Sequence, residues 1–363
     1  MFLQMKKSLS HEEFSKVSDF ILQLFNFVVE NKEYDQEKFL SEFSNQGDWY
    51  LSKSNDESGP VVAGFYNLFN LSIEERQILR EVYLNDINFY NNSDSSTFEL
   101  KAFNLSSPLK AAMHSFLVPF YSNIFNGKGF SEIGDFTNSA FDRFIFFEGY
   151  KSANLDSINV CPACTGQIEV IPTRVLVDLD HYFPKKDYPS LAISADNLIP
   201  LCSTCNAKIK LRESPIDNNG KGAIRRTFLP YKHSGMSEVN VKVTKDNRNK
   251  FKVNLLPKME DEFIEIKIEN FNRIYKITER WESSVEAHYE ALLDELIVRY
   301  SEASIDSEVL RKEVEIQKSV AEIGEKKRAY AFFRKCFLEC VLDDNSIQES
   351  ILVDYKLRKG IGQ

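Results

Sequence analysis

The sequence predicts an α+β protein in which a small central unit of two strands and a helix (ββα) holds a metal and is flanked by mainly helical regions. Three observations predict this class. Apolar residues recur at helical spacing over much of the first 150 residues and again from residue 271 onward. Short alternating runs bounded by turn residues occupy the centre. Two Cys-x-x-Cys pairs, Cys161/Cys164 and Cys202/Cys205, enclose that centre.

The chain of 363 residues is long for one domain, so we expect three parts, 1–150, 151–258 and 259–363. Hydrophobic residues make up 43%, which is enough to bury real cores and excludes a largely disordered chain. No apolar run reaches about 18 residues, which argues against a membrane span. Residues 1–20 mix charged and apolar side chains, unlike a signal peptide. Paired cysteines in such a chain favour metal over disulfides and predict a cytoplasmic protein.

The region 1–150 is predicted to be mostly helical. Apolar positions follow helical spacing over 11–31, and Ser72 and Glu75 have the spacing of a capping box that opens a helix towards residue 90. Residues 108–125 predict a helix that Pro119 kinks or splits, and 137–150 predict another. Residues 44–60 and 91–97, rich in Ser, Asn, Asp and Gly, predict loops. We interpret His114 as a packed or surface residue rather than a ligand.

The central unit is expected to run strand, loop, strand, helix. Residues 169–172 and 175–180 predict short strands. Successive strand residues alternate faces, so Asp178 and Asp180 share one face and His181 lies where the strand ends. Residues 184–200 predict a folded loop, and a helix is expected to begin over 206–211. We interpret Asp178 as a supporting or solvated acid rather than a direct metal ligand.

Beyond this unit, residues 213–222 predict a polar loop, and 239–243 with 250–256 predict an antiparallel pair. Residues 263–268 predict a further strand, and 271–300, 308–323 and 326–342 predict helices. Cys336 and Cys340 lie one helical turn apart, and we interpret them as buried apolar residues. The terminal helices suit either a dimer or partner surface or an internal core.

The net charge of −9 is unevenly distributed. Residues 1–150 carry 12 basic and 21 acidic side chains, whereas residues 205–258 carry 13 basic and four acidic ones. Positive charge concentrated beside the cysteine pairs suits a phosphate backbone, although a solvated sheet face would look the same. The residues that we expect to contact nucleic acid are Lys208, Lys210, Arg212, Arg225 and Arg226.

The four paired cysteines are predicted to hold one structural zinc. Four thiolates complete a tetrahedral zinc site. Zinc ribbons separate their cysteine pairs by about 15–20 residues, whereas here 37 residues lie between Cys164 and Cys202. This interval contains Asp180, His181 and Asn197, so the zinc would tie together the two ends of a small active-site unit.

Asp180-His181 at a strand end, Asn197-Leu-x-x-Leu-Cys-x-x-Cys-Asn206 and a lysine shortly afterwards resemble HNH endonucleases of the ββα-metal type, in their four-cysteine zinc-bearing form. The resemblance covers about 50 residues, 161–210. It implies that His181 is the general base and that Asp180 and Asn206 hold a catalytic Mg²⁺ or Mn²⁺. It implies that Asn197 braces the loop and orients the histidine. The trailing lysine of the family falls between Lys208 and Lys210 here, so either residue is a candidate for the phosphate contact.

The resemblance implies metal-dependent hydrolysis of DNA, in which activated water leaves 5′-phosphate and 3′-hydroxyl ends. A neutral imidazole, with a reference pKa near 6.5, suits the base. One such centre cuts one strand, so duplex cleavage needs a second copy in a homo-oligomer or a second encounter. HNH proteins with large flanks often resemble bacterial anti-phage or restriction effectors, some of which act with an ATPase or sensor partner. The alternatives are an RNA-cleaving HNH enzyme and a catalytically silent zinc module that binds nucleic acid or protein.

Overall fold

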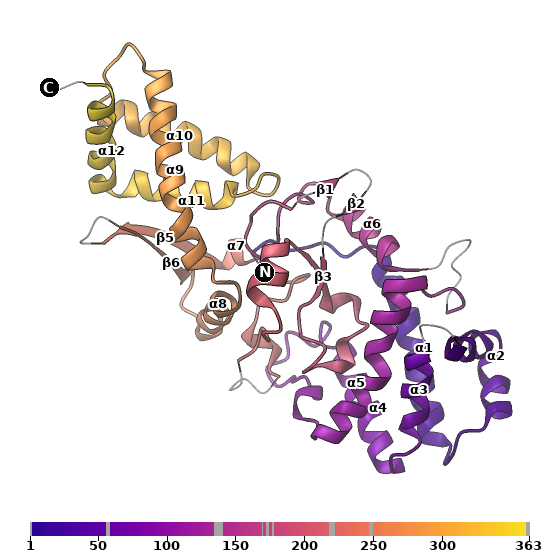
Figure 1. The fold of residues 1–363 in the computed structure, drawn as a ribbon. Helices are drawn as coiled ribbons and strands as arrows, with labels where there is room; N and C mark the ends of the chain where they lie inside the picture. Colours follow the sequence, from indigo (N-terminus) through magenta and orange to yellow (C-terminus); the bar gives the residue numbers. More distant parts are fainter. Residues whose placement is uncertain are drawn as a thin grey trace.

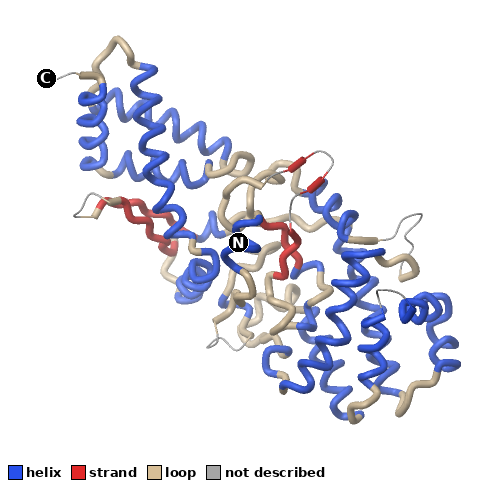
Figure 2. Tube along the Cα trace, in the orientation of Figure 1, coloured by secondary structure: helices blue, strands red, loops and turns tan. Residues whose placement is uncertain are grey.

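The computed structural model describes residues 2–55, 59–133, 141–168, 170–171, 174–175, 178–217, 222–246 and 250–360. The molecule is elongated, with N-terminal helices at one end, C-terminal helices at the other and the strands of the central unit between them (Figures 1 and 2). The sheets of the described residues are two-stranded and antiparallel. This arrangement of many helices and small sheets is compatible with the predicted α+β class. No helix in the described part of the chain is long and apolar enough to cross a membrane.

The N-terminal region is helical, as predicted. Its helices are α1 (Ser10–Glu30), α2 (Gln36–Ser52), α3 (Gly59–Leu68), α4 (Ile73–Ile87), α5 (Ser107–Pro119) and α6 (Arg143–Ala153). Ser72 and Glu75 form the predicted capping box at the start of α4. Pro119 ends α5, and the chain continues as a π-type helix, η3 (Phe120–Lys128). The first residues of the predicted helix 137–150 lie outside the described part.

The expected loop over 44–60 was wrong for most of its length. Residues 44–52 belong to α2, 53–55 form a short 3₁₀ turn and α3 begins at Gly59. The polar residues of this stretch are followed by Trp49 and Tyr50, which are buried in the aromatic core of the region. Tyr50 stacks on Phe120, and its hydroxyl donates to the carbonyl of Val61 at 3.1 Å. Burial of two large aromatic side chains therefore outweighs the loop-forming composition.

The central unit contains β1 (Val170–Ile171), β2 (Arg174–Val175), β3 (Asp178–His181) and β4 (Leu198–Leu201). Strand β3 pairs with β4 so that Asp180 lies opposite Ile199 and His181 opposite Leu198. The loop between them contains two 3₁₀ turns, η4 (Pro189–Leu191) and η5 (Ala195–Asn197). A short π-type helix, η6 (Thr204–Lys210), follows β4. Residues 169, 172, 176 and 177 of the predicted strands lie outside the described part.

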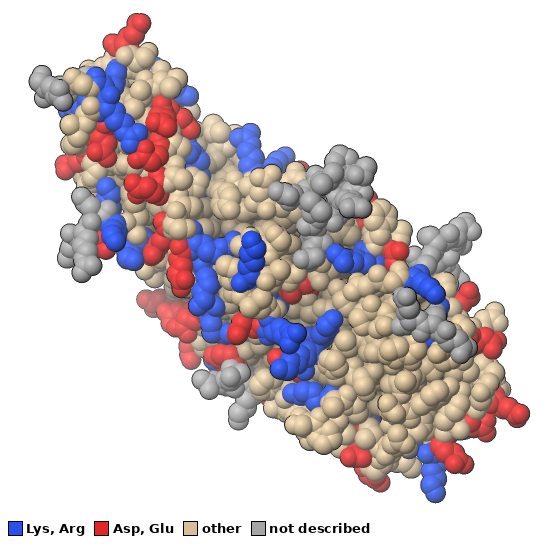
Figure 3. Space-filling model, in the orientation of Figure 1, with Lys and Arg blue, Asp and Glu red and all other residues tan. Residues whose placement is uncertain are grey.

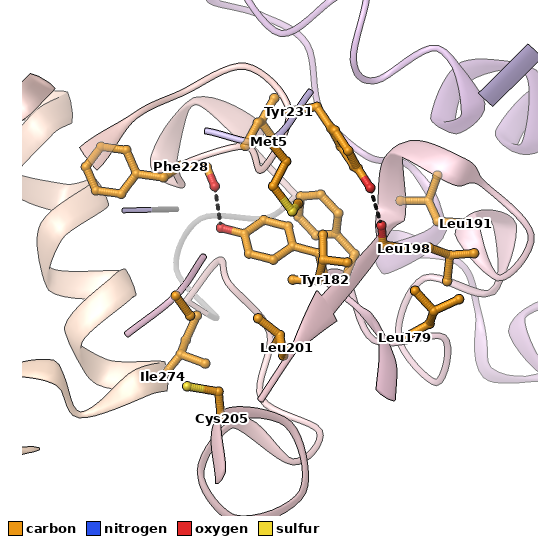
Figure 4. Close-up of a cluster of buried hydrophobic side chains, with 14 of the residues drawn as sticks. Met5, Leu179, Tyr182, Leu191, Leu198, Leu201, Cys205, Phe228, Tyr231 and Ile274 are labelled. Carbon is orange, nitrogen blue, oxygen red and sulfur yellow. Dashed lines mark hydrogen bonds between the residues drawn. The ribbon is translucent and has the colours of Figure 1, made fainter. Parts of the chain in front are cut away.

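A compact core fastens this unit to the segments around it (Figure 4). The hydroxyl of Tyr182 donates to the carbonyl of Phe228, and that of Tyr231 donates to the carbonyl of Leu198, both at 2.7 Å. Met5 contributes to the same buried cluster. The core therefore joins the chain start, the β3–β4 pair and the segment after residue 222.

Residues 2–5 lie far from the helices that follow them in sequence. The amide of Leu3 donates to the carbonyl of Pro162 at 3.1 Å, and that of Met5 donates to the carbonyl of Pro230 at 3.0 Å. The ring of Phe2 packs against Phe271, Trp281 and Phe332 in the C-terminal region. This short segment thus links the central unit to the C-terminal helices.

The C-terminal region begins with a hairpin and continues as a helical bundle. Its elements are α7 (Gly235–Glu238), β5 (Val239–Lys245), β6 (Phe251–Pro257), α8 (Glu262–Tyr275), α9 (Ile277–Arg299), α10 (Ser307–Gly324), α11 (Ala331–Asp343) and α12 (Asn345–Arg358). The predicted antiparallel pair is confirmed as β5–β6. The predicted helix 271–300 is divided between α8 and α9 at Lys276, which adopts a left-handed backbone conformation (φ 51°). Helix α12 was not predicted.

The predicted strand over 263–268 was wrong, because these residues belong to α8. Asp261 caps this helix by accepting a hydrogen bond from the amide of Phe263. Ile264, Ile268 and Phe271 are all buried. Their spacing is that of one helix face, so the alternating look of the first six residues was a local coincidence.

The β5–β6 hairpin packs against α9 and α11 rather than against the β3–β4 pair (Figure 1). The amide of Val253 donates to Glu282 of α9, and that of Val243 donates to the sulfur of Cys340 in α11. Cys336 of α11 is buried, in agreement with its interpretation as an apolar residue. The lysines of the hairpin are therefore carried away from the central unit, and the basic stretch 205–258 does not form one continuous patch beside it.

Candidate active site and metal centre

Strand β3 ends at a pocket of about 290 Å³. Its lining comes from β3 (Asp180 and His181), from the loop after it (Pro184, Lys185 and Lys186), from the end of η6 and beyond (Lys210, Leu211 and Arg212) and from helix α5 (His114). The pocket thus joins the predicted base to several cationic side chains. A hollow of this size with converging polar groups suits a phosphate-containing ligand.

The imidazole of His181 is fixed in one tautomer. Its Nε2 atom lies 2.9 Å from the carbonyl oxygen of Ala192, which can only accept a hydrogen bond. The proton therefore resides on Nε2, and Nδ1 keeps a lone pair. The pKa of His181 is lowered to about 3, mainly by burial and to a smaller extent by the charges of Lys185 and Lys210. The hydrogen bond to Ala192 acts in the opposite direction and raises this pKa. The side chain is consequently a neutral proton acceptor at physiological pH.

Asn197 fastens the loop between β3 and β4. Its side chain is fully buried, accepts from the amide of Phe183 at 2.7 Å and donates to the carbonyls of Phe183 and Leu191 at 3.0 Å. Its own carbonyl accepts from the amide of Tyr182 at 2.8 Å. Leu191 precedes Ala192, the residue that fixes the imidazole. Asn197 therefore holds the loop in the conformation that orients His181.

The carboxylate of Asp180 forms an ion pair with the ammonium group of Lys210. Its Oδ2 atom lies 2.9 Å from Nζ of Lys210, and the side chains of both residues are buried, with exposures of 8% and 1%. Nζ of Lys210 also donates to the carbonyl of His181 at 2.8 Å. Asn206, the second expected ligand, is not among the pocket-lining residues. Of the two expected ligands, only Asp180 therefore lines the pocket.

The five residues that were expected to contact nucleic acid differ in exposure and in their ion-pair partners. Lys208 and Arg212 are exposed, whereas Lys210 is buried against Asp180. Arg226 forms an ion pair with Asp217 at 2.9 Å, and the guanidinium of Arg225 lies over the ring of Phe263. Lys and Arg side chains gather along the middle of the face drawn in Figure 3. Lys208 and Arg212 are therefore the better placed of the five to meet a backbone phosphate.

Cys161, Cys164, Cys202 and Cys205 form a cluster in which the four sulfur atoms lie within 4.8 Å of one another. The sulfurs of Cys164 and Cys202 are 3.9 Å apart, which is too far for a disulfide. A tetrahedral zinc with Zn–S bonds near 2.3 Å separates its sulfurs by about 3.8 Å. Burial raises the pKa of Cys161, so a buried cation is needed to hold all four as thiolates. The cluster therefore fits a metal such as zinc.

The surroundings of the cluster support its sulfurs. The amide of Gly166 donates to the sulfur of Cys164 at 3.4 Å, and the guanidinium of Arg280 donates to that of Cys205 at 3.2 Å. A Cβ atom at Gly166 would lie 3.1 Å from the sulfur of Cys164 and 2.9 Å from the hydroxyl of Tyr330. Donors of this kind stabilise thiolate ligands. Because Arg280 belongs to α9, the cluster also anchors the C-terminal bundle.

Sequence reasoning missed that the N-terminal helices contact the pocket and the strand and loop that form it. The ring of Tyr121 lies edge-on to His181, with centroids 4.3 Å apart, and its hydroxyl donates to the carbonyl of Leu179. The buried carboxyl group of Asp86 accepts from the hydroxyl of Ser190 at 2.6 Å. His114 lines the pocket itself. No local pattern marks these residues, because their partners lie more than 50 residues away in the chain.

Comparisons of the chain with protein-family models, with curated proteins and with solved structures returned no match.

Proposed function

We propose that this protein is a phosphodiester hydrolase of the HNH type that cuts DNA, with a structural zinc at the four-cysteine cluster. The observation that carries the proposal is the fixed, neutral imidazole of His181 on the wall of a cationic pocket. Such an imidazole can take a proton from water as the water attacks phosphorus. The resemblance of residues 161–210 to HNH endonucleases points to the same reaction.

The charges of the pocket favour a phosphate group as the ligand. Lys185, Lys186 and Arg212 line it, and its carboxylate, Asp180, is already paired with Lys210. A phosphodiester bound here would offset the repulsion among these cations. Its negative charge would also favour the imidazolium form, so that the pKa of His181 rises when substrate binds and the residue becomes a stronger base.

Two exposed cationic side chains near the pocket in sequence suit a longer nucleic acid. Lys208 and Arg212 lie on the surface around η6, where they can contact phosphates that flank the one being cut. DNA is the proposed substrate and RNA the alternative. A role in bacterial defence belongs to the resemblance and is proposed on that basis alone.

The resemblance also implies Mg²⁺ or Mn²⁺ at Asp180. An ion held through Oδ2 would have to share that oxygen with the ammonium of Lys210, whereas Oδ1 is the other oxygen through which the carboxylate can bind a cation. The proposed roles of His181 and of the cations do not depend on such an ion. Cleavage is therefore to be measured in EDTA as well as with each added metal.

The test is single-turnover cleavage of end-labelled DNA and RNA of the same sequence, single-stranded and duplex. His181→Gln keeps a donor for the carbonyl of Ala192 but cannot act as the base, so we expect cleavage to fall by about 10²–10⁴-fold. His288→Ala, which removes a histidine outside the pocket, serves as the matched control. Zinc content and melting temperature establish that both variants fold.

Three results would separate the alternatives. Cleavage of RNA but not DNA by the native protein would favour the RNA-cutting HNH enzyme. Salt-sensitive binding of nucleic acid without cleavage under any metal condition would favour the silent zinc module. Undiminished cleavage by His181→Gln would show that the chemistry takes place elsewhere and would overturn the proposal.

A further inference from the structure

The pocket contains a second histidine, to which the hydrolysis proposed above assigns no role. His114 is half-buried and lines the pocket from α5, outside the stretch that resembles HNH enzymes. In the described part of the chain it forms no hydrogen bond or ion pair. A second imidazole beside a proposed phosphodiester site is therefore available for chemistry rather than engaged in holding the fold.

The helix that carries His114 is held firmly against its surroundings. A Cβ atom at Gly64 of α3 would lie 2.3 Å from the carbonyl oxygen of Ser115, so the backbones of α3 and α5 approach closely beside His114. On the other side, α5 packs against η4, the turn next to Ala192. The loop that orients His181 and the helix that presents His114 are thus parts of one packed structure, which suits two side chains that must act on one substrate.

Hydrolysis of a phosphodiester needs a group that His181 cannot supply. Water loses a proton as its oxygen bonds to phosphorus, and the departing 3′-oxygen must be protonated or bound by a cation. The carboxylate of Asp180, which was expected to hold a metal for this purpose, is paired with Lys210 through Oδ2. The guanidinium of Arg212 does not release a proton in proteins. An imidazolium is the side chain best suited to donate one near neutral pH.

We propose that His114 is a second catalytic residue of this pocket and protonates the leaving 3′-oxygen. The inference rests on the proposed phosphodiester hydrolysis. As the bond from water oxygen to phosphorus forms, the water proton passes to Nδ1 of His181. As the bond from phosphorus to the 3′-oxygen breaks, a proton passes from His114 to that oxygen. The products are a 5′-phosphate and a 3′-hydroxyl, and the two histidines regain their starting states by proton exchange with solvent.

The charges around His114 explain when it would be protonated. Lys110 precedes it by one turn on α5, Lys185 and Lys186 face it from the loop after β3, and Lys210, Arg212 and Asp180 complete the surroundings. Partial burial and the ammonium of Lys185 lower the pKa of His114 in the free protein. A bound phosphodiester brings negative charge between these groups, which favours the imidazolium form. The acid is therefore generated by the substrate.

The test uses leaving groups of different basicity. The bond that the native protein cuts is first mapped, and the bridging 3′-oxygen at that bond is then replaced by sulfur, because a thiolate leaves without protonation. We expect His114→Ala to cut the natural substrate about 10²–10⁴-fold more slowly but the sulfur substrate within a few-fold of the native rate. His181→Gln should lose both. Ser115→Ala, on the adjacent exposed position of α5, should lose neither.

Each other outcome is decisive. Native-rate cleavage of the natural substrate by His114→Ala would overturn the inference, as would an equal loss on both substrates, which marks a residue needed only for structure or binding. His114→Gln replaces the alanine variant if melting shows that the latter is unfolded. A native protein that cuts no bond would refute the hydrolase itself, and so the two failures are distinguishable.

Discussion

Replacing Lys210 with methionine would remove the ammonium group that is paired with the buried carboxylate of Asp180. Breaking a buried ion pair from one side typically costs about 3–5 kcal/mol. The loss at this pair has a ceiling, because Asp180 can take up a proton and become neutral. With an ordinary carboxyl pKa near 3.9 in the unfolded chain, protonation at pH 7 costs about 4 kcal/mol, at 1.36 kcal/mol per pH unit. We therefore expect Lys210→Met to lower the free energy of unfolding by about 4 kcal/mol at pH 7.

The same reasoning predicts that the stability loss of Lys210→Met becomes smaller as the pH falls. In the variant, the folded protein binds a proton that the unfolded chain releases above its carboxyl pKa, so the loss shrinks as pH falls and should be about 1.5 kcal/mol at pH 5. Urea unfolding at both pH values measures it, with Lys208→Met as the exposed control, expected within about 0.5 kcal/mol of the native protein. A loss below about 1 kcal/mol at pH 7, or one that does not shrink at pH 5, would refute the buried pair.

The metal cluster and the loop after β3 each lead to a further prediction. Cys205→Ser should reduce bound zinc, measured by elemental analysis, and lower the melting temperature, because three thiolates hold zinc less tightly than four; native protein without zinc, purified in the absence of chelators, would contradict the cluster's role. Asn197→Ala leaves buried polar groups of Phe183 and Leu191 without their partner, at about 1–3 kcal/mol for each group, and an unfolding free energy equal to that of the native protein would contradict the role of this side chain.

The parts of the site that sequence reasoning predicted depend on short-range spacing. Two cysteines separated by two residues can both point towards one ion, so the cluster of Cys161, Cys164, Cys202 and Cys205 was predictable once both pairs were seen. Strand β3 overlaps the predicted strand over 175–180, whereas β4 was missed, because residues 198–200 were assigned to the loop over 184–200 and their pairing with β3 is a tertiary contact. The bracing role of Asn197 came from the resemblance and agrees with its three side-chain hydrogen bonds.

The parts that sequence reasoning missed depend on tertiary packing. The burial of Trp49 overrides a loop-like composition, and the buried face of α8 becomes visible only when its pattern is followed as far as Phe271. The pairing of Lys210 with Asp180 depends on the π-type turn of η6, which no local pattern predicts. His114 reaches the pocket because α5 packs across the loop after β3, and the two segments are separated by more than 60 residues of chain.

The anchoring of residues 2–5 bears on when this protein can complete its fold during synthesis. Residues 2–5 leave the ribosome long before the C-terminal region does, yet Phe2 packs against Trp281 and Phe332 of that region. Contacts over such sequence distances form late, since the intervening chain must first be ordered. The core that supports β3 and β4 therefore stays open at one side throughout most of translation. A growing chain would complete this core only after the helices that contact Phe2 have been made.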